Sequence, residues 1–284
     1  MPEYSGDESP VPCNCCGADK FKPAVDCKTF KYVRCVSCGL VQRNPQPLTS
    51  DIIERYSRTY GEDYLSYELK NEGAFFDLQR LALKDAGFFT LEASLLSGGN
   101  APSVLDVGCA SGSVLVFLRE RGWRVTGVEI SPCAEYAKKE RGLDVRNIPL
   151  EENSFADKSF DVVLASHLIE HLNDPRSFLT ETRRILKDDG HIFITTPNID
   201  GFQARIFRGN WRSAIFDHLY LFSISTLKKL LKKFGFTTEK ISTWGGLASG
   251  SAPLWLKKIA DPLAKRLRSG DVMIVKAKKL GGGF

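Results

Sequence analysis

The first 38 residues hold six of the eight cysteines in this chain of 284 residues. Two Cys-x-x-Cys-Gly knuckles account for four of them, and tetrahedral zinc prefers four such thiolates. The glycine after each knuckle permits a tight turn that aims backbone amides at the sulfurs. We therefore expect a structural zinc site, in preference to free thiols, at Cys13, Cys16, Cys35 and Cys38. Cys15 or Cys27 could replace one of these ligands.

A second group with chemical potential is the loop Asp106-Val-Gly-Cys-Ala-Ser-Gly112, which follows an apolar run and precedes an amphipathic one. Gly108 would allow a sharp turn after a strand, and Gly112 would allow close approach of helix and ligand. Glu129 follows about twenty residues later, where such folds place an acid for ribose hydroxyls. The dinucleotide pattern G-x-G-x-x-G is absent, and Asp106 would repel a pyrophosphate. The loop therefore suits a cationic ligand better than a dinucleotide.

Histidine is the residue best suited to proton transfer near neutral pH, and the chain has four. We expect His191, at the start of a strand, to be structural. His167 and His171 are spaced for a helical metal pair, but the His-Glu-x-x-His order and an evident third ligand are lacking. For His167 a contact with cofactor or substrate and a structural role are equally favoured. For Glu170 and His171 a packing or hydrogen-bonding role is favoured. His218 is our preferred base, against a role in tying its loop to the core.

Composition sets limits on the remaining function classes. The chain is 43% hydrophobic with a net charge of +5, and no apolar run reaches the roughly 20 residues that cross a bilayer. The polar N-terminus differs from a signal peptide, so we expect a cytoplasmic protein. The modest charge disfavours nucleic acid as a partner. We interpret the late lysine and arginine clusters as solvated helix faces rather than a polyanion-binding surface.

The elements that must position these residues alternate between β-branched runs and amphipathic segments, which indicates βαβ units. We predict a doubly wound α/β (Rossmann-like) sheet preceded by a small zinc module. The predicted strands are 103–107, 124–129, 160–165, 191–196, 236–243 and 271–278. The predicted helices are 112–121, 132–141, 175–187, 226–234 capped by Ser225, and a basic segment at 253–268. We divide the chain into a zinc module (1–47), a helical segment (48–100) that Thr49 or Ser50 could cap, and the α/β domain (101–284) with a functional loop at 198–222.

The run Val104 to Gly112 resembles motif I of class I S-adenosylmethionine-dependent methyltransferases, and Glu129 resembles their second acidic position. Phe160 to Pro175 is similar to the family's fourth-strand segment, so the resemblance covers about 101–197. It implies S-adenosylmethionine as methyl donor and places its adenine against 147–150. The cofactor-binding residues implied are Asp106, Gly108, Cys109, Gly112, Glu129, Ile130, Ile148 and His167. His167 and His218 then become the candidates for catalysis.

Residues 32–47 are similar to the zinc modules of some sugar and natural-product methyltransferases. This likeness implies methyl transfer to an oxygen or nitrogen of a small molecule, such as a sugar or glycan precursor, with loop 198–222 covering the acceptor. The sugar C-methyltransferases of this kind carry a further C-terminal domain for catalysis, so their reaction is not carried over. RNA methylation and a non-catalytic binding role are the alternatives, although the intact loop and Glu129 argue against the second. The sequence leaves the acceptor and the oligomeric state open.

Overall fold

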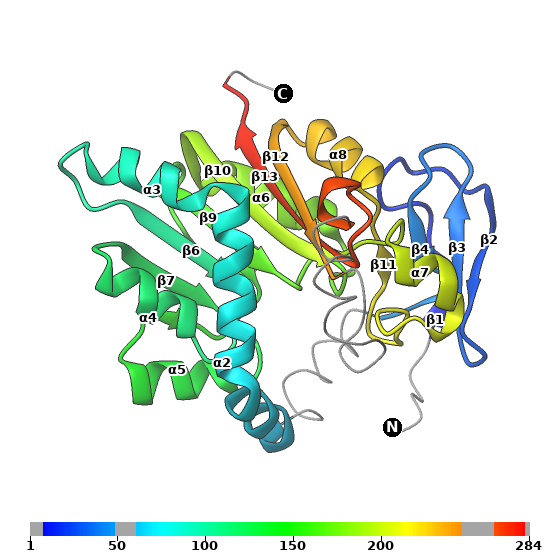
Figure 1. Cartoon of the computed structure of the whole chain (residues 1–284), viewed down its shortest axis with the longest axis horizontal. Coiled ribbons are helices and arrows are strands. Elements are labelled where there is room, and N and C mark those ends of the chain that lie inside the picture. The colour runs from blue at the N-terminus through cyan, green and yellow to red at the C-terminus, as the bar shows by residue number, and fades with distance from the viewer. Residues whose placement is uncertain (1–7, 49–60, 246–263, 282–284) are drawn as a thin grey trace.

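The structure is a computed structural model that describes residues 8–48, 61–245 and 264–281, with backbone alone at 61–63. Its main feature is a seven-stranded sheet with the order β12-β13-β10-β9-β6-β7-β8 (Figure 1). The strands are β6 (Ser103–Val107), β7 (Arg124–Val128), β8 (Val145–Arg146), β9 (Phe160–Ser166), β10 (Leu186–Pro197), β12 (Phe236–Trp244) and β13 (Val272–Lys279). The run from β10 to β8 is parallel, whereas β13 lies antiparallel between β10 and β12. The predicted Rossmann-like class is confirmed.

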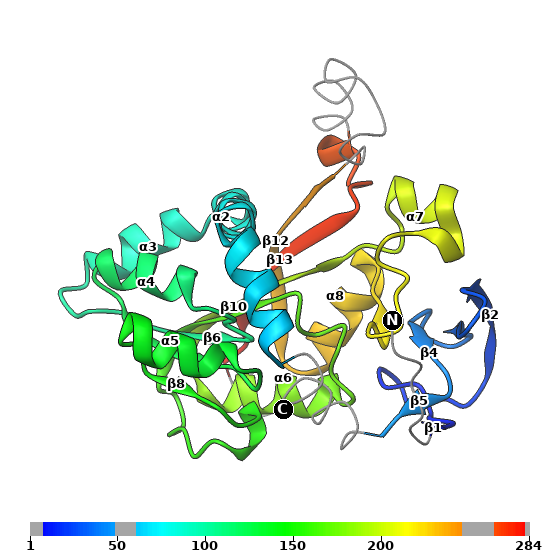
Figure 2. The same cartoon turned by 90° about the horizontal axis from the view of Figure 1, so that it is seen from below.

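Helices cover both faces of this sheet, as Figure 2 shows. The helices are α2 (Gly61–Ala86), α3 (Phe88–Leu96), α4 (Ser113–Glu120), α5 (Cys133–Arg141), α6 (Pro175–Ile185) and α8 (Ile224–Lys233). Alternate residues of a strand face opposite sides of a sheet, so Val104 packs with α2, α3 and α4 while Leu105 packs with α6 and α8. The carboxyl ends of β6, β7 and β9 meet at one edge, where such sheets bind ligands.

A smaller antiparallel sheet with the order β11-β4-β3-β2 stands beside the main sheet (Figure 1). Three of its strands come from the N-terminal module, namely β2 (Phe21–Asp26), β3 (Lys31–Cys35) and β4 (Val41–Arg43). The fourth, β11 (Tyr220–Leu221), comes from the end of the predicted functional loop. β1 (Glu8–Ser9) and β5 (Gln46–Pro47) form a separate pair. Module and loop therefore share one sheet.

The structure corrects several predicted boundaries. α6 ends at Ile185, and Leu186 already pairs with Phe160, so β10 begins before the expected His191. Ser223, not Ser225, caps α8, because its hydroxyl and the Thr226 side chain form a reciprocal capping box.

Other predictions concern segments that are only partly described. The loop 198–222 contains the short helix α7 (Phe202–Phe207) as well as β11. Most of the basic segment 253–268, together with Thr49 and Ser50, lies outside the described residues. In the described part of the chain no helix has the length and apolar character needed to cross a bilayer.

Candidate active site

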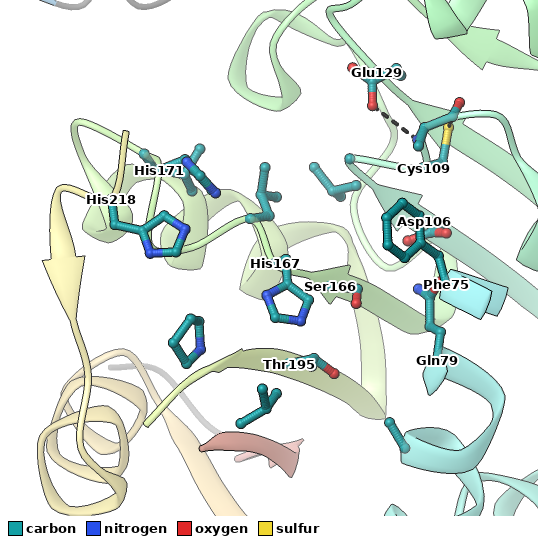
Figure 3. Close-up of a pocket in the computed structure, with 18 of the residues that line it drawn as sticks. Phe75, Gln79, Asp106, Cys109, Glu129, Ser166, His167, His171, Thr195 and His218 are labelled. Atoms are coloured by element: carbon teal, nitrogen blue, oxygen red, sulfur yellow. Dashed lines mark hydrogen bonds between the residues drawn. The ribbon is translucent and has the colours of Figure 1, made fainter. Parts of the chain in front are cut away.

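A cavity of about 1480 Å³ opens at the carboxyl edge of the parallel strands. Residues at the carboxyl ends of β6, β7, β9 and β10 line it, together with one face of α2 and part of the loop 198–222. Figure 3 shows Asp106 and Glu129 toward one end, His171 and His218 toward the other, and His167 between them. The cavity thus joins the predicted cofactor residues to the predicted catalytic residues.

The loop after β6 is shaped by backbone geometry that favours glycine. Gly108 has a φ of 76°, and its amide donates to the carbonyl of Val128 over 2.7 Å. Gly112 has a φ of 80°, and a Cβ there would collide with the Leu143 side chain. Gly112 therefore serves both the turn and the packing of the loop against Leu143.

Asp106 is a buried carboxylate that faces the cavity. Its Oδ1 has no hydrogen-bond partner, and its side chain is 2% exposed. Burial, reinforced by the nearby charge of Glu129, raises the pKa of Asp106 to about 8. Because a buried carboxylate without a partner is costly, this position favours a cationic ligand group.

Glu129, at the end of β7, is held in one orientation by two backbone amides. Its Oε2 accepts from Ala110 over 3.0 Å and its Oε1 accepts from Ser131 over 2.8 Å. Its remaining lone pairs can accept hydroxyl protons. An unpartnered acid beside an oriented acid fits S-adenosylmethionine, which has an ammonium group at its amino-acid end and a ribose diol.

Other predicted cofactor residues divide into two groups. Cys109, Ile130 and His167 line the cavity, whereas its described lining includes neither Gly112 nor Ile148. Ile148 is 42% exposed instead.

Sequence reasoning missed an acidic pair at the expected adenine end. Glu151 and Glu152 line the cavity directly after Leu150, and burial raises the pKa of Glu151. The sequence could have indicated them, because they directly follow the segment 147–150 that we expected to contact the adenine.

His167 immediately follows β9 and carries backbone strain. Its φ is 51°, a left-handed conformation that is uncommon for a residue with a side chain, and its amide donates to Thr195 over 2.8 Å. Its Nδ1 lies 3.2 Å from Oε1 of Glu170, while 48% of its side chain is exposed. Burial would raise the pKa of Glu170, but the hydrogen bond and charge of His167 lower it to about 2. Glu170 therefore makes a hydrogen bond, as the sequence led us to favour, and it orients the His167 ring.

His171 and His218 lie in contact at the same end of the cavity, with ring centroids 4.6 Å apart. Nδ1 of His218 is 2.8 Å from the Ser213 carbonyl, and Nδ1 of His171 is 2.9 Å from the Asp217 carbonyl. Burial, with the neighbouring His171, lowers the pKa of His218 to about 4. A neutral imidazole of such low basicity is a weaker proton acceptor than an ordinary histidine.

The α2 wall of the cavity is largely aromatic and apolar. Tyr64 and Tyr67, from the tyrosine-rich stretch, line it with Phe75 and Leu78. Tyr67 is 57% and Leu78 51% exposed. The other two tyrosines of that stretch lie outside the described residues.

The four cysteines of the two knuckles converge in the N-terminal module. Their sulfurs lie within 4.8 Å of one another, with Cys13 to Cys38 at 3.4 Å and Cys16 to Cys35 at 3.5 Å. Sulfurs around tetrahedral zinc would be roughly 3.8 Å apart. Cys15 and Cys27 are not in this cluster.

Direct contacts connect this module to the segment that carries His218. The buried Tyr32 hydroxyl lies 2.8 Å from the carbonyl oxygens of both Ile215 and His218. The Arg43 guanidinium donates to the Phe216 carbonyl over 3.0 Å and covers its ring at 3.7 Å. The module therefore fixes the backbone around His218.

Two lysines of α8 bind the knuckles rather than only facing solvent. Lys229 donates to the Cys38 carbonyl over 3.0 Å, and Lys233 donates to the Cys15 carbonyl over 2.8 Å. Part of the basic surface thus serves to hold the module against α8.

Comparison with known proteins assigns the chain to a family. A family model described as "Methyltransferase domain" matches residues 68–241. Ubiquinone biosynthesis O-methyltransferases are among the curated relatives, with 32% identity to that of Pasteurella multocida and 30% to that of Salmonella paratyphi A. These matches cover 45% and 46% of this chain and 58% and 55% of the relatives. The chain therefore spans about half the length of the curated relatives it matches.

Solved structures share the fold at low identity. A SAM-dependent methyltransferase from Archaeoglobus fulgidus has a TM-score of 0.53 and 23% identity, and the match covers 76% of this chain and 99% of that one. A SAM-dependent methyltransferase from Thermotoga maritima has a TM-score of 0.50 and 22% identity, with the same coverage.

Proposed function

Because the chain belongs to the methyltransferase-domain family and is an S-adenosylmethionine-dependent methyltransferase, we propose that it methylates a hydroxyl oxygen of a small molecule. Bound S-adenosylmethionine supplies a methyl group on a sulfonium, which leaves as a neutral thioether after in-line attack. The chain must then bind the donor, orient the acceptor and accept one proton.

In this proposal Asp106 and Glu129 bind the methyl donor. The unpartnered Asp106 carboxylate would pair with the donor's ammonium group, and Glu129 would accept from the ribose hydroxyls. Cys109 and Ile130 would contribute the adjoining wall, with Glu151 toward the adenine.

His167 is the proposed base at the acceptor end. Its Nδ1 is hydrogen-bonded to Glu170. Its Nε2 can therefore accept the proton of the acceptor hydroxyl within the cavity. Our earlier preference, His218, is buried, and its pKa is lowered to about 4. The observation that carries the proposal is that His167, which Glu170 orients, lines the same cavity as Asp106.

An acceptor that combines a hydroxyl with apolar surface fits this cavity best. Tyr67, Phe75 and Leu78 form an apolar wall along α2, while Arg212 and Gln203 provide polar groups at the acceptor end. The relatives named for ubiquinone biosynthesis support O-methylation of a small molecule. The sugar or glycan acceptor that we expected has no such support.

A methyl-transfer screen tests this proposal. Zinc-loaded protein would be given labelled S-adenosylmethionine and hydroxylated aromatics with and without apolar tails, nucleotide-sugars, small amines and RNA. We expect turnover with hydroxylated aromatics, greatest with apolar tails, and its loss in His167→Asn while donor binding persists. Turnover confined to nucleotide-sugars, amines or RNA would overturn the proposed acceptor.

We also propose that residues 1–47 form a zinc-binding module, 48–100 a helical cap and 101–284 the catalytic domain. Cys13, Cys16, Cys35 and Cys38 would hold one structural zinc, because their converging sulfurs suit a closed tetrahedral site. Metal analysis of the purified chain should find one zinc, and Cys16→Ser should lose it.

A further inference from the structure

Three side chains that suit a metal ion meet beside the proposed base. One ligand atom each from Glu170, His171 and His218 lies within 4.8 Å of the other two. Glu170 and His171 follow β9, and His218 precedes β11, 47 residues after His171 along the chain. The Glu170 carbonyl accepts the amides of Leu219 and Tyr220, over 2.7 and 3.2 Å. These backbone bonds bring the two segments together.

The tautomer of both imidazoles follows from their backbone contacts. Nδ1 of His171 faces the Asp217 carbonyl, and Nδ1 of His218 faces the Ser213 carbonyl. A carbonyl oxygen can only accept, so each Nδ1 carries the proton and each Nε2 carries the lone pair. Metal-binding histidines are commonly oriented in this way.

Glu170 supplies the carboxylate of the group. It is fully buried, and its oxygens accept from His167 over 3.2 Å and from the Thr196 hydroxyl over 2.9 Å. Each contact uses one lone pair of an oxygen that has two, so a carboxylate oxygen can also bind an ion. A fully buried carboxylate beside two neutral imidazoles is an arrangement that a cation would stabilise.

The spacing is close to that of a metal site. Three atoms within 4.8 Å of one another have a centre at most roughly 2.8 Å from each, and metal–ligand bonds are about 2.0–2.2 Å. Binding of an ion at that centre would therefore move each ligand atom by less than about 0.8 Å. His171 and His218 also line the cavity, as Figure 3 shows, so open coordination positions would face the acceptor.

We propose that Glu170, His171 and His218 bind one divalent transition-metal ion at the acceptor end of the cavity. Two imidazoles and one carboxylate with open positions suit ions from Mn²⁺ to Zn²⁺, whereas the four thiolates of the module select zinc. The two sites therefore differ in ligand chemistry as well as in place.

The role of this ion rests on the proposed function. An acceptor hydroxyl bound to it would become more acidic, and His167 would take its proton as the oxygen attacks the methyl group. The ion would also orient an acceptor that carries two neighbouring oxygens. His167 is then the base, and Glu170 serves both His167 and the ion.

Manganese binding tests the site without any acceptor. Full-length protein loaded with one equivalent of zinc, which the four thiolates would hold, would be titrated with Mn²⁺ while electron paramagnetic resonance follows the free ion. Excess zinc is left out because it binds imidazole and carboxylate ligands more tightly than Mn²⁺ does. We expect one Mn²⁺ per chain, and a loss of affinity of roughly 100-fold or more in His171→Gln and His218→Gln, since even outer-shell changes cost about 10- to 100-fold.

His191→Asn is the matched control. His191 is also largely buried and lies 3.2 Å from a carboxylate, Glu239, but it is not in the cluster. The His191→Asn variant should bind Mn²⁺ like the unchanged protein. Retained S-adenosylmethionine binding would show that each variant is folded. Absence of Mn²⁺ binding, or equal binding by both cluster variants, would overturn the site. Methyl transfer without Mn²⁺ binding refutes this inference alone, whereas Mn²⁺ binding without methyl transfer to any hydroxyl refutes the proposed function.

Discussion

The Tyr32 hydroxyl offers a sharp test of the connection between the cysteine module and the acceptor end of the cavity. It is buried and lies 2.8 Å from the carbonyl oxygens of Ile215 and His218. Tyr32→Phe removes this donor while keeping the ring. The two carbonyls would lose a buried hydrogen-bond partner, which costs about 1–3 kcal/mol.

This loss should appear as easier local opening of the segment that carries His218. A change of about 1–3 kcal/mol corresponds to amide exchange about 5- to 150-fold faster wherever exchange occurs by that opening. Hydrogen–deuterium exchange read by mass spectrometry would measure this in peptides covering 211–222. The amides of β6 and β7, in the main sheet, should keep their protection.

The matched control is Tyr67→Phe, because the Tyr67 side chain is 57% exposed in the α2 wall. Its exchange pattern at 211–222 should equal that of the unchanged protein. Unaltered protection of 211–222 in Tyr32→Phe would refute the reasoning. So would an equal loss of protection throughout the main sheet, since that would indicate global destabilisation instead.

Three further predictions follow from the same geometry. Removal of zinc by a chelator, or by Cys16→Ser, should speed amide hydrogen exchange in the module and in 211–222 but leave β6 unchanged. Unchanged exchange at 211–222 would show that the sheet shared by the module and this loop does not couple them. His167→Asn should lower single-turnover methyl transfer by about 10²- to 10⁴-fold without weakening donor binding, and persistent turnover would exclude it as the base. Because the pKa of Asp106 is raised to about 8, mainly by burial, the donor-free protein holds that proton at pH 7, and binding a cationic donor should release it. Calorimetry in phosphate and Tris buffers would detect this release, which Asp106→Asn should abolish.

Local patterns in the sequence were enough to predict six of the seven strands of the main sheet, and the two-residue strand β8 was missed. The run at 103–107 is a fully buried parallel strand rich in apolar residues, and Asp174 with Pro175 marks the start of α6. The convergence of Asp106 and Glu129 followed from the same logic, because carboxyl ends of neighbouring parallel strands share an edge.

Long-range contacts were what sequence reasoning could not supply. β11 has two residues and exists only because it pairs with β4, about 180 positions earlier. The contact of Glu170 with His167 is local, over three residues, but the position of Glu170 beside His218 depends on tertiary structure. The same holds for Lys229 and Lys233, whose spacing is that of a solvated helix face although both bind the knuckles.

The account depends most directly on Asp106 as the anchor of the methyl donor. Calorimetry of S-adenosylmethionine binding to the zinc-loaded chain would be compared for the unchanged protein, Asp106→Ala and Asp161→Asn, a partly buried aspartate at the opposite end of the sheet. We predict that the unchanged protein and Asp161→Asn bind the donor alike, and that Asp106→Ala binds it about 10- to 150-fold more weakly, since a charge-assisted bond contributes about 1.5–3 kcal/mol. Failure of the unchanged protein to bind the donor, or equal binding by Asp106→Ala, would contradict the account.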